Sequence, residues 1–593
     1  MNPRRPTPLL LALAALALAA APPAADAQDV ESFWGGLRAR LAEGEVLRAT
    51  GSLHLQAALN RFNSASGAVR RDAPLTYGAT AGVHFDVLGI QAPFSLAVSG
   101  RDTRYSLPAY AFAGLSPSYR WVTLHGGDRT MAFSPYSLSG VNFRGGGLEL
   151  TPGRWYVAGM YGRLRGERIE DAGAIQTGLA LDDYRRVGHG LKVGYAPGDD
   201  SEVTLSYFGS ADGFSESDSG DVARAALGIL PERNAVLTVG ARHRLSALVS
   251  LEAEAARSVL TRDDTAPELP GGGAMGSLFG LVTPRTSTQG ANAVSGAVNF
   301  TPAFAKFRLR YERIDPGYRT HGSLFFQDDL ENVTAGATAP LFARRLNLHL
   351  SGGLQRSDLR GDRAAALRRV IGSASAAVVW REGVTTTLQA SNFSTTNRYR
   401  SLDLARPLVD SVVLAQTQLS LSATHAMALG DGDAQQLTVA GSYQRADLIR
   451  DGEADARQGT TFLLASVNYA LRPSERHGFT GGLLANGNGT ATAQILLVGP
   501  SAGYGYRLPE DRGELNARVS YNLTRVSLRG AGLAPGAEPT STGRLLSLGL
   551  DAGYRLTERQ RLRAAASFIA AGDTGAQPGY DDLQLQLAYA LTL

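Results

Sequence analysis

The stretch LQLQLAYALTL, from Leu583 to Leu593, closes the sequence with a strict alternation of apolar and polar side chains. In an extended chain every second side chain points the same way. One face would therefore carry Leu583, Leu585, Leu587, Tyr589, Leu591 and Leu593. The other would carry Gln584, Gln586, Ala588, Ala590 and Thr592. The period of two predicts a β-strand with one apolar face. Such a strand suits the edge of a soluble sandwich as well as the wall of a barrel.

The same alternation recurs along the chain. It is found in GSLHLQAALN (51–60), YGATAGVHFDV (77–87), KFRLRYERI (306–314) and LLSLGLDAGYRL (545–556). The polar face of these segments and of ELNARVSYNLT (514–524) is charged in several places. We predict that its side chains face the interior of a barrel, namely Arg308, Arg310, Glu312, Arg518 and Asp551.

Turn signals separate the barrel from the sandwich. Short turns are predicted at 151–153, 197–200, 244–247, 301–304, 340–345, 381–383, 429–433, 472–475, 509–512 and 557–560. They recur at intervals of roughly 40 to 55 residues, and the connections between them are longer and rich in Gly, Ser, Asp and Pro. Alternating strands of about ten residues, with short turns at one end and long loops at the other, are typical of outer-membrane barrels.

We therefore predict an all-β fold, a single closed antiparallel transmembrane β-barrel over residues 46–593, with short periplasmic turns and long extracellular loops. A repeat of roughly 22 to 24 residues predicts about 24 strands, within a range of 22 to 26. There is no composition shift that would mark a second domain. A lumen of this width is too large for side chains alone to fill.

The N-terminal residues predict the compartment. Arg4 and Arg5 precede the apolar run 9–21, and Ala25-Asp26-Ala27 fits a cleavage site, so residues 1–27 read as a secretory signal peptide. Residues 28–45 would form a short periplasmic segment that could dock a periplasmic partner. The protein is thus expected in the outer membrane of a bacterium with two membranes, as a multi-pass barrel.

Composition limits the function classes. The sequence has no cysteine, a formal net charge of +4 and no basic run of the kind that nucleic-acid binding needs. After the leader no stretch approaches 18 uninterrupted apolar residues, so no transmembrane helix is expected. The histidines are scattered singly, without a nucleophile elbow or a metal-binding pair. We expect no enzyme, and no catalytic residue, metal or cofactor.

Contacts with the envelope are expected at two further places. Aromatic side chains in or near strands would form girdles beside outer-membrane lipid and lipopolysaccharide: Tyr77, Trp121, Trp155, Tyr311, Tyr521 and Tyr589. Ordinary strand propensity of tyrosine would explain them too. The segment 583–593 resembles the C-terminal signal that the barrel assembly machinery reads, although Leu593 stands where Phe or Trp is commoner.

Two segments could narrow the lumen. One is DRTMAFSPYSLSGVNF (128–143), and the other is the glycine-flanked run 271–282, a possible constriction loop with Gly271, Met275, Leu278 and Phe279. Mobile external loops are the alternative for both. A charged set near the first segment would brace the wall or form a selectivity ring. Its members are Arg120, His125, Asp128, Arg129 and Arg144.

Residues 70–165 contain elements that recur elsewhere. They are Arg70-Arg71-Asp72, the stretches 116–121 and 133–136, and the hairpin 148–153. In these the chain resembles a group of large, uncharacterised outer-membrane barrel proteins of bacteria. The size resembles that of a TonB-dependent transporter without its plug. The resemblance implies the fold and the location, and no chemistry.

Two functions fit these observations. The first is porin-like, passive or gated passage of small hydrophilic solutes, which a wide polar lumen favours. The alternative is a barrel scaffold or conduit that works with envelope partner proteins in export or surface attachment, to which long loops and residues 28–45 are suited. The sequence favours the first.

Overall fold

A computed structural model describes residues 47–64, 74–87, 90–100, 110–166, 184–213, 229–269, 278–324, 326–363, 365–399, 412–430, 434–450, 453–454, 458–528, 540–573 and 578–593. The expected signal peptide (1–27) and the segment 28–45 lie outside these residues. No helix in the described part of the chain is long and apolar enough to cross a membrane. The described residues fold almost entirely into strands, with one 3-10 turn, η1 (Pro509–Asp511).

The strands of the first half are β1 (Leu47–Ser64), β2 (Leu75–Val87), β3 (Ile90–Gly100), β4 (Tyr110–Leu115), β5 (Ser118–Tyr119), β6 (Val122–Thr130), β7 (Asn142–Leu150), β8 (Trp155–Arg165), β9 (Arg185–Gly198), β10 (Ser201–Gly213), β11 (Arg233–Arg244), β12 (Val249–Thr261), β13 (Thr288–Phe300) and β14 (Lys306–Ile314). Those of the second half are β15 (Leu330–Leu341), β16 (Leu346–Arg356), β17 (Ala365–Arg381), β18 (Val384–Tyr399), β19 (Val412–Ala428), β20 (Gln435–Arg450), β21 (Glu453–Ala454), β22 (Thr460–Leu471), β23 (His477–Thr490), β24 (Ala493–Arg507), β25 (Gly513–Leu528), β26 (Thr540–Thr557), β27 (Gln560–Ala571) and β28 (Tyr580–Thr592).

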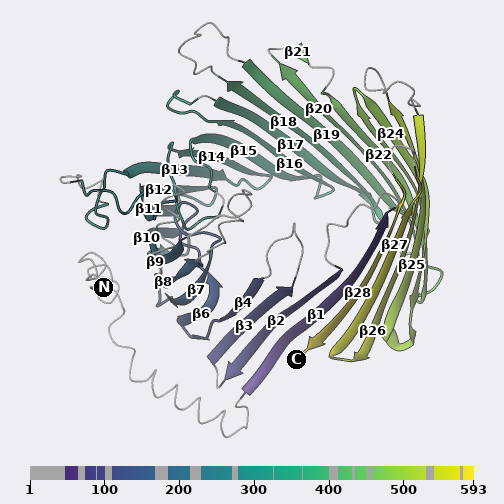
Figure 1. Cartoon of the computed structure of the whole chain (residues 1–593), viewed down its shortest axis with the longest axis horizontal. Coiled ribbons are helices and arrows are strands. Elements are labelled where there is room, and N and C mark those ends of the chain that lie inside the picture. Colours follow the sequence, from purple (N-terminus) through teal and green to yellow (C-terminus); the bar gives the residue numbers. More distant parts are fainter. Residues whose placement is uncertain are drawn as a thin grey trace.

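The strands form one closed antiparallel wall (Figure 1). Neighbours in the chain pair with one another, and β1 pairs with β28 from Ser52↔Thr592 to Ser64↔Tyr580. Two of the 28 strands have only two residues: β5 continues β4, and β21 folds back on β20. The described wall therefore has 26 strands, at the upper end of the predicted range. The number exceeds about 24 because several connections have only two residues, such as 199–200, 382–383 and 558–559.

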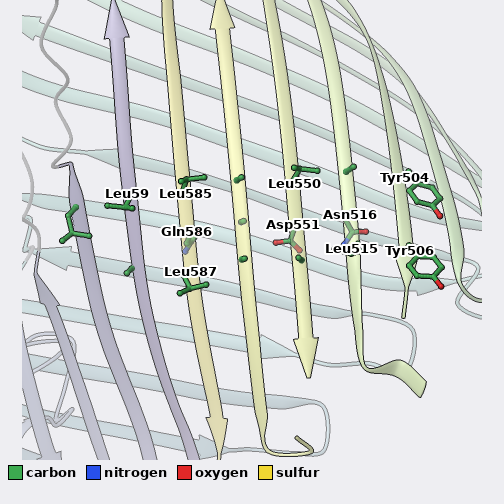
Figure 2. Close-up of a pocket in the computed structure, with 17 residues that line it drawn as sticks. Leu59, Tyr504, Tyr506, Leu515, Asn516, Leu550, Asp551, Leu585, Gln586 and Leu587 are labelled. Atoms are coloured by element: carbon green, nitrogen blue, oxygen red, sulfur yellow. The ribbon is translucent and has the colours of Figure 1, made fainter. Parts of the chain in front are cut away.

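The two faces of the wall differ in chemistry. Along the seam, register places Leu59, Leu585, Ala566 and Leu550 on one face. Figure 2 shows this face, with the labelled leucines in front of their strands and other strands of the barrel behind. The apolar side chains therefore point outward, and Leu550 is 61% exposed.

The positions between them alternate to the inner face. In β25 and β26 the inner positions include Asn516 and Asp551, which are register partners. Alternation of this kind follows from the pleat of a strand, which turns successive side chains to opposite sides. The polar face of the alternating segments is thus the inner face of the wall.

The ten predicted turns all fall at connections between consecutive strands. They lie at one end of the wall, because each follows a strand that runs in the same direction. We call this the short-turn end. At the opposite end, the segments 131–141 and 315–324 fold back onto the wall and form the site described next.

Candidate functional site

Two connections from distant parts of the chain meet on the inner wall. The first, 131–141, joins β6 to β7, and the second, 315–324, follows β14. We call them the internal loop pair. Both contain Pro and Gly, and the first has Ser at intervals that suit a strand poorly, so neither extends its neighbouring strands.

The two loops are held together by direct hydrogen bonds. Tyr318 Oη donates to the carbonyl oxygen of Tyr136 at 2.7 Å, and Thr320 Oγ1 donates to that of Ser137 at 2.5 Å. The N–H of Ser139 donates to the carbonyl oxygen of Gly322 at 2.7 Å. The rings of Tyr136 and Tyr318 meet edge to face, with centroids 6.4 Å apart. These contacts make the two loops one packed unit.

Apolar side chains seat the loop pair on the wall. Met131, Phe133, Leu138 and Val141 form a buried cluster with wall residues Phe143, Ala158, Met160 and Phe208. Tyr136 and Tyr318 lie in a second cluster with Val236, Ala256, Ala291, Ala293, Ile314 and Leu330. Several wall residues beneath the loops are alanines, which leave room for the large loop side chains. Burial of this kind stabilises by about 25 cal/mol per Å² of apolar surface.

The face that receives the loops is the polar one. Tyr136 Oη donates to Glu312 Oε1 at 2.5 Å, and Ser134 Oγ donates to Glu254. Glu312 shares its face of β14 with Arg310, whereas Leu309 and Tyr311 occupy the outer face and are exposed. The expectation that segment 128–143 folds inward thus agrees with these contacts over its central part, 131–141.

Buried polar groups fix the second loop in place. Asn234, which is 1% exposed, donates through Nδ2 to the carbonyl oxygen of Arg319 at 3.0 Å. Its Oδ1 accepts from the N–H of His321 at 3.2 Å, and Ser258 Oγ also donates to the Arg319 carbonyl, at 2.5 Å. Asn234 thus uses its amide donor and its amide acceptor at the same time, and so fixes the backbone at Arg319 and at His321.

His321 connects the loop pair to a buried charge cluster. Its Nδ1 is 2.9 Å from Ser210 Oγ, and its Nε2 is 3.2 Å from Glu232 Oε2. Arg186 bridges Glu232 and Asp212 from the same side, with contacts of 3.0 Å and 2.6 Å. The cluster thus alternates in sign, so that its buried charges compensate one another.

Burial sets the protonation state of this cluster. Burial lowers the pKa of His321, and the neighbouring carboxylate of Glu232 offsets this only in part. Burial would raise the pKa of Glu232, but the nearby His321 side chain and the Arg186 guanidinium outweigh it and hold that pKa at about 2. At neutral pH the imidazole is uncharged and the carboxylate is charged.

Ion pairs also line the inner wall, both beside the loops and away from them. Arg308 contacts Glu252 at 2.7 Å, and Arg310 contacts Glu312 at 3.1 Å. Asp551 receives two hydrogen bonds from Arg563, at 2.8 and 3.1 Å. Arg518 lies on the same face as Asp551. The five predicted inner residues of these strands therefore share the polar face, and four of them form ion pairs that brace the wall.

The charged set around β6 is divided between two faces. His125 and Arg129 lie on the inner face. His125 Nδ1 is 2.8 Å from Ser116 Oγ, and Arg129 donates a hydrogen bond to Ser95 Oγ at 3.0 Å. Asp128 and Arg144 instead share the outer face with Leu124 and Leu148. Arg144 donates two hydrogen bonds to the Asp128 carboxylate, at 2.8 and 2.9 Å. Arg120 lies in the turn before β6, over the ring of Tyr119.

The prediction that these five residues form one network inside the barrel is therefore wrong. Asp128 and Arg144 differ from their neighbours because alternation in β7 sends Phe143 inward, into the loop-pair cluster, and Arg144 outward. Asp128 follows Gly127, whose φ of 88° interrupts the regular strand backbone. Its carboxylate also accepts a hydrogen bond from the N–H of Ala113 at 3.1 Å and so links β6 to β4.

The proposed constriction loop has a different position. Gly271 and Met275 lie outside the described residues. Leu278 is fully buried, with Val282, against Tyr207, Ala235 and Val259. These three alternate with the inner residues Phe208, Val236 and Ser258, so this contact is made on the outer face. Phe279 is exposed. The described part of this segment therefore lies on the opposite face from the loop pair.

The predicted girdle residues lie mainly on the outer face. Tyr77, Trp155, Tyr311, Tyr521 and Tyr589 all alternate with inner residues of their strands. Trp121 lies in the turn before β6. Trp155 packs on Tyr195, with ring centroids 4.6 Å apart, and Tyr311 donates to Glu331 at 2.9 Å. Tyr521 lies mid-strand rather than at an end.

Loop 315–324 is the part of the site that the sequence did not predict. DPGYRTHGSL, from Asp315 to Leu324, reads as an ordinary turn with a polar continuation. Its one usable signal is Tyr318, an aromatic residue in a turn segment, which the structure buries completely.

Comparisons with known proteins find no family match and only low structural similarity. No family model matches the chain, and no curated protein matches it. An E. coli P pilus assembly intermediate, PapC-PapD-PapK-PapG, aligns with TM-score 0.41 and 11% identity, over 92% of this chain and 61% of that chain.

Two further solved structures are similar at the same low level. The siderophore receptor PirA from Acinetobacter baumannii aligns with TM-score 0.39 and 9% identity, over 92% of this chain and 80% of that one. OpdQ from Pseudomonas aeruginosa aligns with TM-score 0.28 and 10% identity, over 92% and 98%. At these values we base no functional argument on them.

Proposed function

We propose that this protein is an outer-membrane β-barrel that lets small hydrophilic solutes pass, in the manner of a porin, along a path narrowed by the internal loop pair. The observation that carries the proposal is the division of one closed wall into an apolar outer face and a charged inner face. A closed wall leaves no unpaired strand edge, which is what a lipid environment requires of a β-structure.

The outer face supports the membrane part of the proposal. Leu550, Leu587 and Leu59 are each more than half exposed on that face. Exposed leucines in such a continuous band are unfavourable in water and favourable in hydrocarbon. The signal peptide expected at residues 1–27 would take the chain to the envelope, and the outer membrane is where closed barrels of this kind occur.

The loop pair supports a restricted passage rather than a fully open one. In its two buried clusters it packs on strands between β7 and β15, so it lies against one side of the inner wall. Neither buried cluster includes a described residue of β16 to β28. A solute would therefore pass between the loop pair and the opposite wall.

Single-channel conductance of the purified, folded protein in planar bilayers tests the proposal. We expect steady conductance steps, and uptake of sugars into proteoliposomes with a size limit. Tyr136→Ala with Tyr318→Ala removes the two rings that seat the loops and should raise both the conductance and the size limit. Tyr521→Ala, an outer-face change of the same type, is the matched control and should leave both unchanged.

A barrel that is silent as wild type and as the double variant would contradict passage of small solutes. In that case a protein that co-purifies in fixed ratio would favour the alternative, a scaffold or conduit that works with envelope partners. If the double variant conducts while wild type is silent, the loop pair is a closed gate that a signal must open.

A further inference from the structure

A second polar region of the inner wall lies far from the loop pair, at the short-turn end. There a cavity of about 940 Å³ is lined by β1, β24 to β28 and the turn 508–512. Five of its lining residues are arginines, at positions 507, 512, 555, 561 and 563, and two are acidic, Asp511 and Glu514. The cavity is therefore basic, although the chain as a whole is close to neutral.

The register shows that this cavity opens on the inner face. Arg563 is the partner of both Ala588 and Gly553, and Ala588 is the partner of Gln56. All of these positions alternate with outward leucines or alanines, such as Leu587 and Ala564. A solute in the lumen would meet these arginines, whereas a lipid beside the outer face would not.

Two of the arginines lack a compensating carboxylate. Arg555 and Arg561 are direct partners across β26 and β27. Arg555 donates to the backbone carbonyl of Glu510 at 2.8 Å, and neither guanidinium forms an ion pair among the described residues. Like charges placed directly opposite on a sheet destabilise it. An anion between them would remove this repulsion.

The remaining arginines are already neutralised to different degrees. Arg563 is paired with Asp551 through two hydrogen bonds, and Arg512 contacts Glu510 at 2.7 Å. Arg507 is 3.9 Å from Asp511, a loose contact. Arg555 and Arg561 are thus the pair whose positive charges no carboxylate balances among the described residues, and Arg507 flanks them. Guanidinium groups bind carboxylate and phosphate oxygens through two parallel hydrogen bonds.

We propose that Arg555 and Arg561 form a binding site for small oxyanions, carrying a carboxylate or a phosphate group, on the inner wall of the barrel. The inference rests on the proposed function, since it names the class of solute that the passage would favour. The cavity is large enough for a small organic anion, and its uncharged inner residues Gln56, Ala588 and Ala590 would leave room for the rest of the molecule.

Calorimetric titration of the folded protein in detergent, with inorganic phosphate and separately with succinate, measures binding without any passage. We expect saturable binding of at least one of the two, and the comparison identifies the preferred oxyanion. Arg555→Gln with Arg561→Gln should weaken it by about tenfold or more, because charged hydrogen bonds to both side chains are lost. Arg369→Gln, an inner-wall arginine on β17 that contacts Gln355, is the matched control and should bind normally.

Block of chloride current by the preferred anion in planar bilayers is the second readout. The block should weaken by a similar factor in the double variant and not in Arg369→Gln. Absence of saturable binding in wild type, or equal binding in the double variant, would overturn the inference while leaving conductance intact. Binding by a barrel that never conducts would uphold the site and refute the passage.

Discussion

Single residues decide how the internal loop pair is attached, and His321 is one whose charge can change in mild acid. It is buried between Ser210 and Glu232, with Arg186 and Asp212 in the same cluster. Because Glu232 has a pKa of about 2, it stays charged over the whole physiological range. Protonation of His321 is therefore the event that mild acid would bring about.

Acidification should loosen the second loop. The pKa of His321 is lower in the folded protein than its ordinary value of 6.5, so the unfolded chain binds the proton more readily. The stability that neutral His321 contributes is complete above about pH 6.5 and is lost progressively as the pH falls below it. Hydrogen exchange of residues 315–324 should accelerate between pH 7 and pH 5, after correction for intrinsic rates.

His321→Gln provides the control for this pH effect. Glutamine can donate and accept hydrogen bonds but does not titrate, so the pH dependence of exchange in 315–324 should flatten. An unchanged pH dependence in this variant would assign the effect to another group.

At the scale of elements, the loop pair and the strands follow different rules. The strands are specified locally, by alternation, whereas the loops are specified by contacts between distant residues. Thr320 and Ser137 are 183 positions apart. Gly322 shows how close this contact is, because a Cβ placed there would lie 2.2 Å from the carbonyl oxygen of Ser137.

Gly322→Ala should therefore separate the two loops without disturbing the wall. The added methyl group meets backbone atoms, which cannot move aside as a side-chain end would. We expect faster hydrogen exchange in 131–141 and 315–324 and a loss of stability of about 1–3 kcal/mol. Gly372→Ala on β17, where a Cβ meets nothing within 4 Å, is the control. Equal effects of the two variants would contradict the docking of the loops.

Neighbouring residues of β28 test the two faces of the strand. Leu587, 52% exposed, points outward, and Gln586 points inward. Leu587→Arg should destabilise the barrel in lipid vesicles by about 2–4 kcal/mol if the position lies at the middle of the membrane. Gln586→Arg introduces the same side chain into the lumen and should cost little. Urea unfolding in vesicles measures both, and similar losses would refute the assignment of the faces.

For the whole molecule, closure between β1 and β28 is the defining contact. Gln56 and Ala588 are partners across this seam. The sequence has no cysteine, so Gln56→Cys with Ala588→Cys would create the only pair. Cross-strand partners have the separation that a disulfide needs, and we expect rapid oxidation to an intramolecular cross-link that changes gel mobility. Gln56→Cys with Gln584→Cys, out of register, should remain reduced; efficient cross-linking there would indicate another register.

The sequence predicted the wall better than the site. The ten turns and the alternating strands were predictable because Pro, Gly and Asp set turns locally and the pleat sets alternation locally. The loop pair was predictable only in its first half, since Ser134, Pro135 and Gly140 break a strand pattern visibly. The partner loop was missed because nothing near Tyr318 reveals a contact with Tyr136. Asp128 and Arg144 were misplaced because the prediction grouped charged residues by their nearness in sequence, whereas alternation puts these two on the opposite face from His125 and Arg129.

The seam also has a consequence for the rate and yield of folding. Its partners, such as Ser52 and Thr592, are separated by almost the entire described chain, so their encounter carries a large loop-closure entropy and should be late and slow. Until they meet, β1 and β28 each expose an unpaired edge that can pair with another molecule. Closure within one chain does not depend on concentration, whereas pairing between chains does. Dilution should therefore raise the yield of closed barrel on refolding, and crowding should divert the same chains into aggregates.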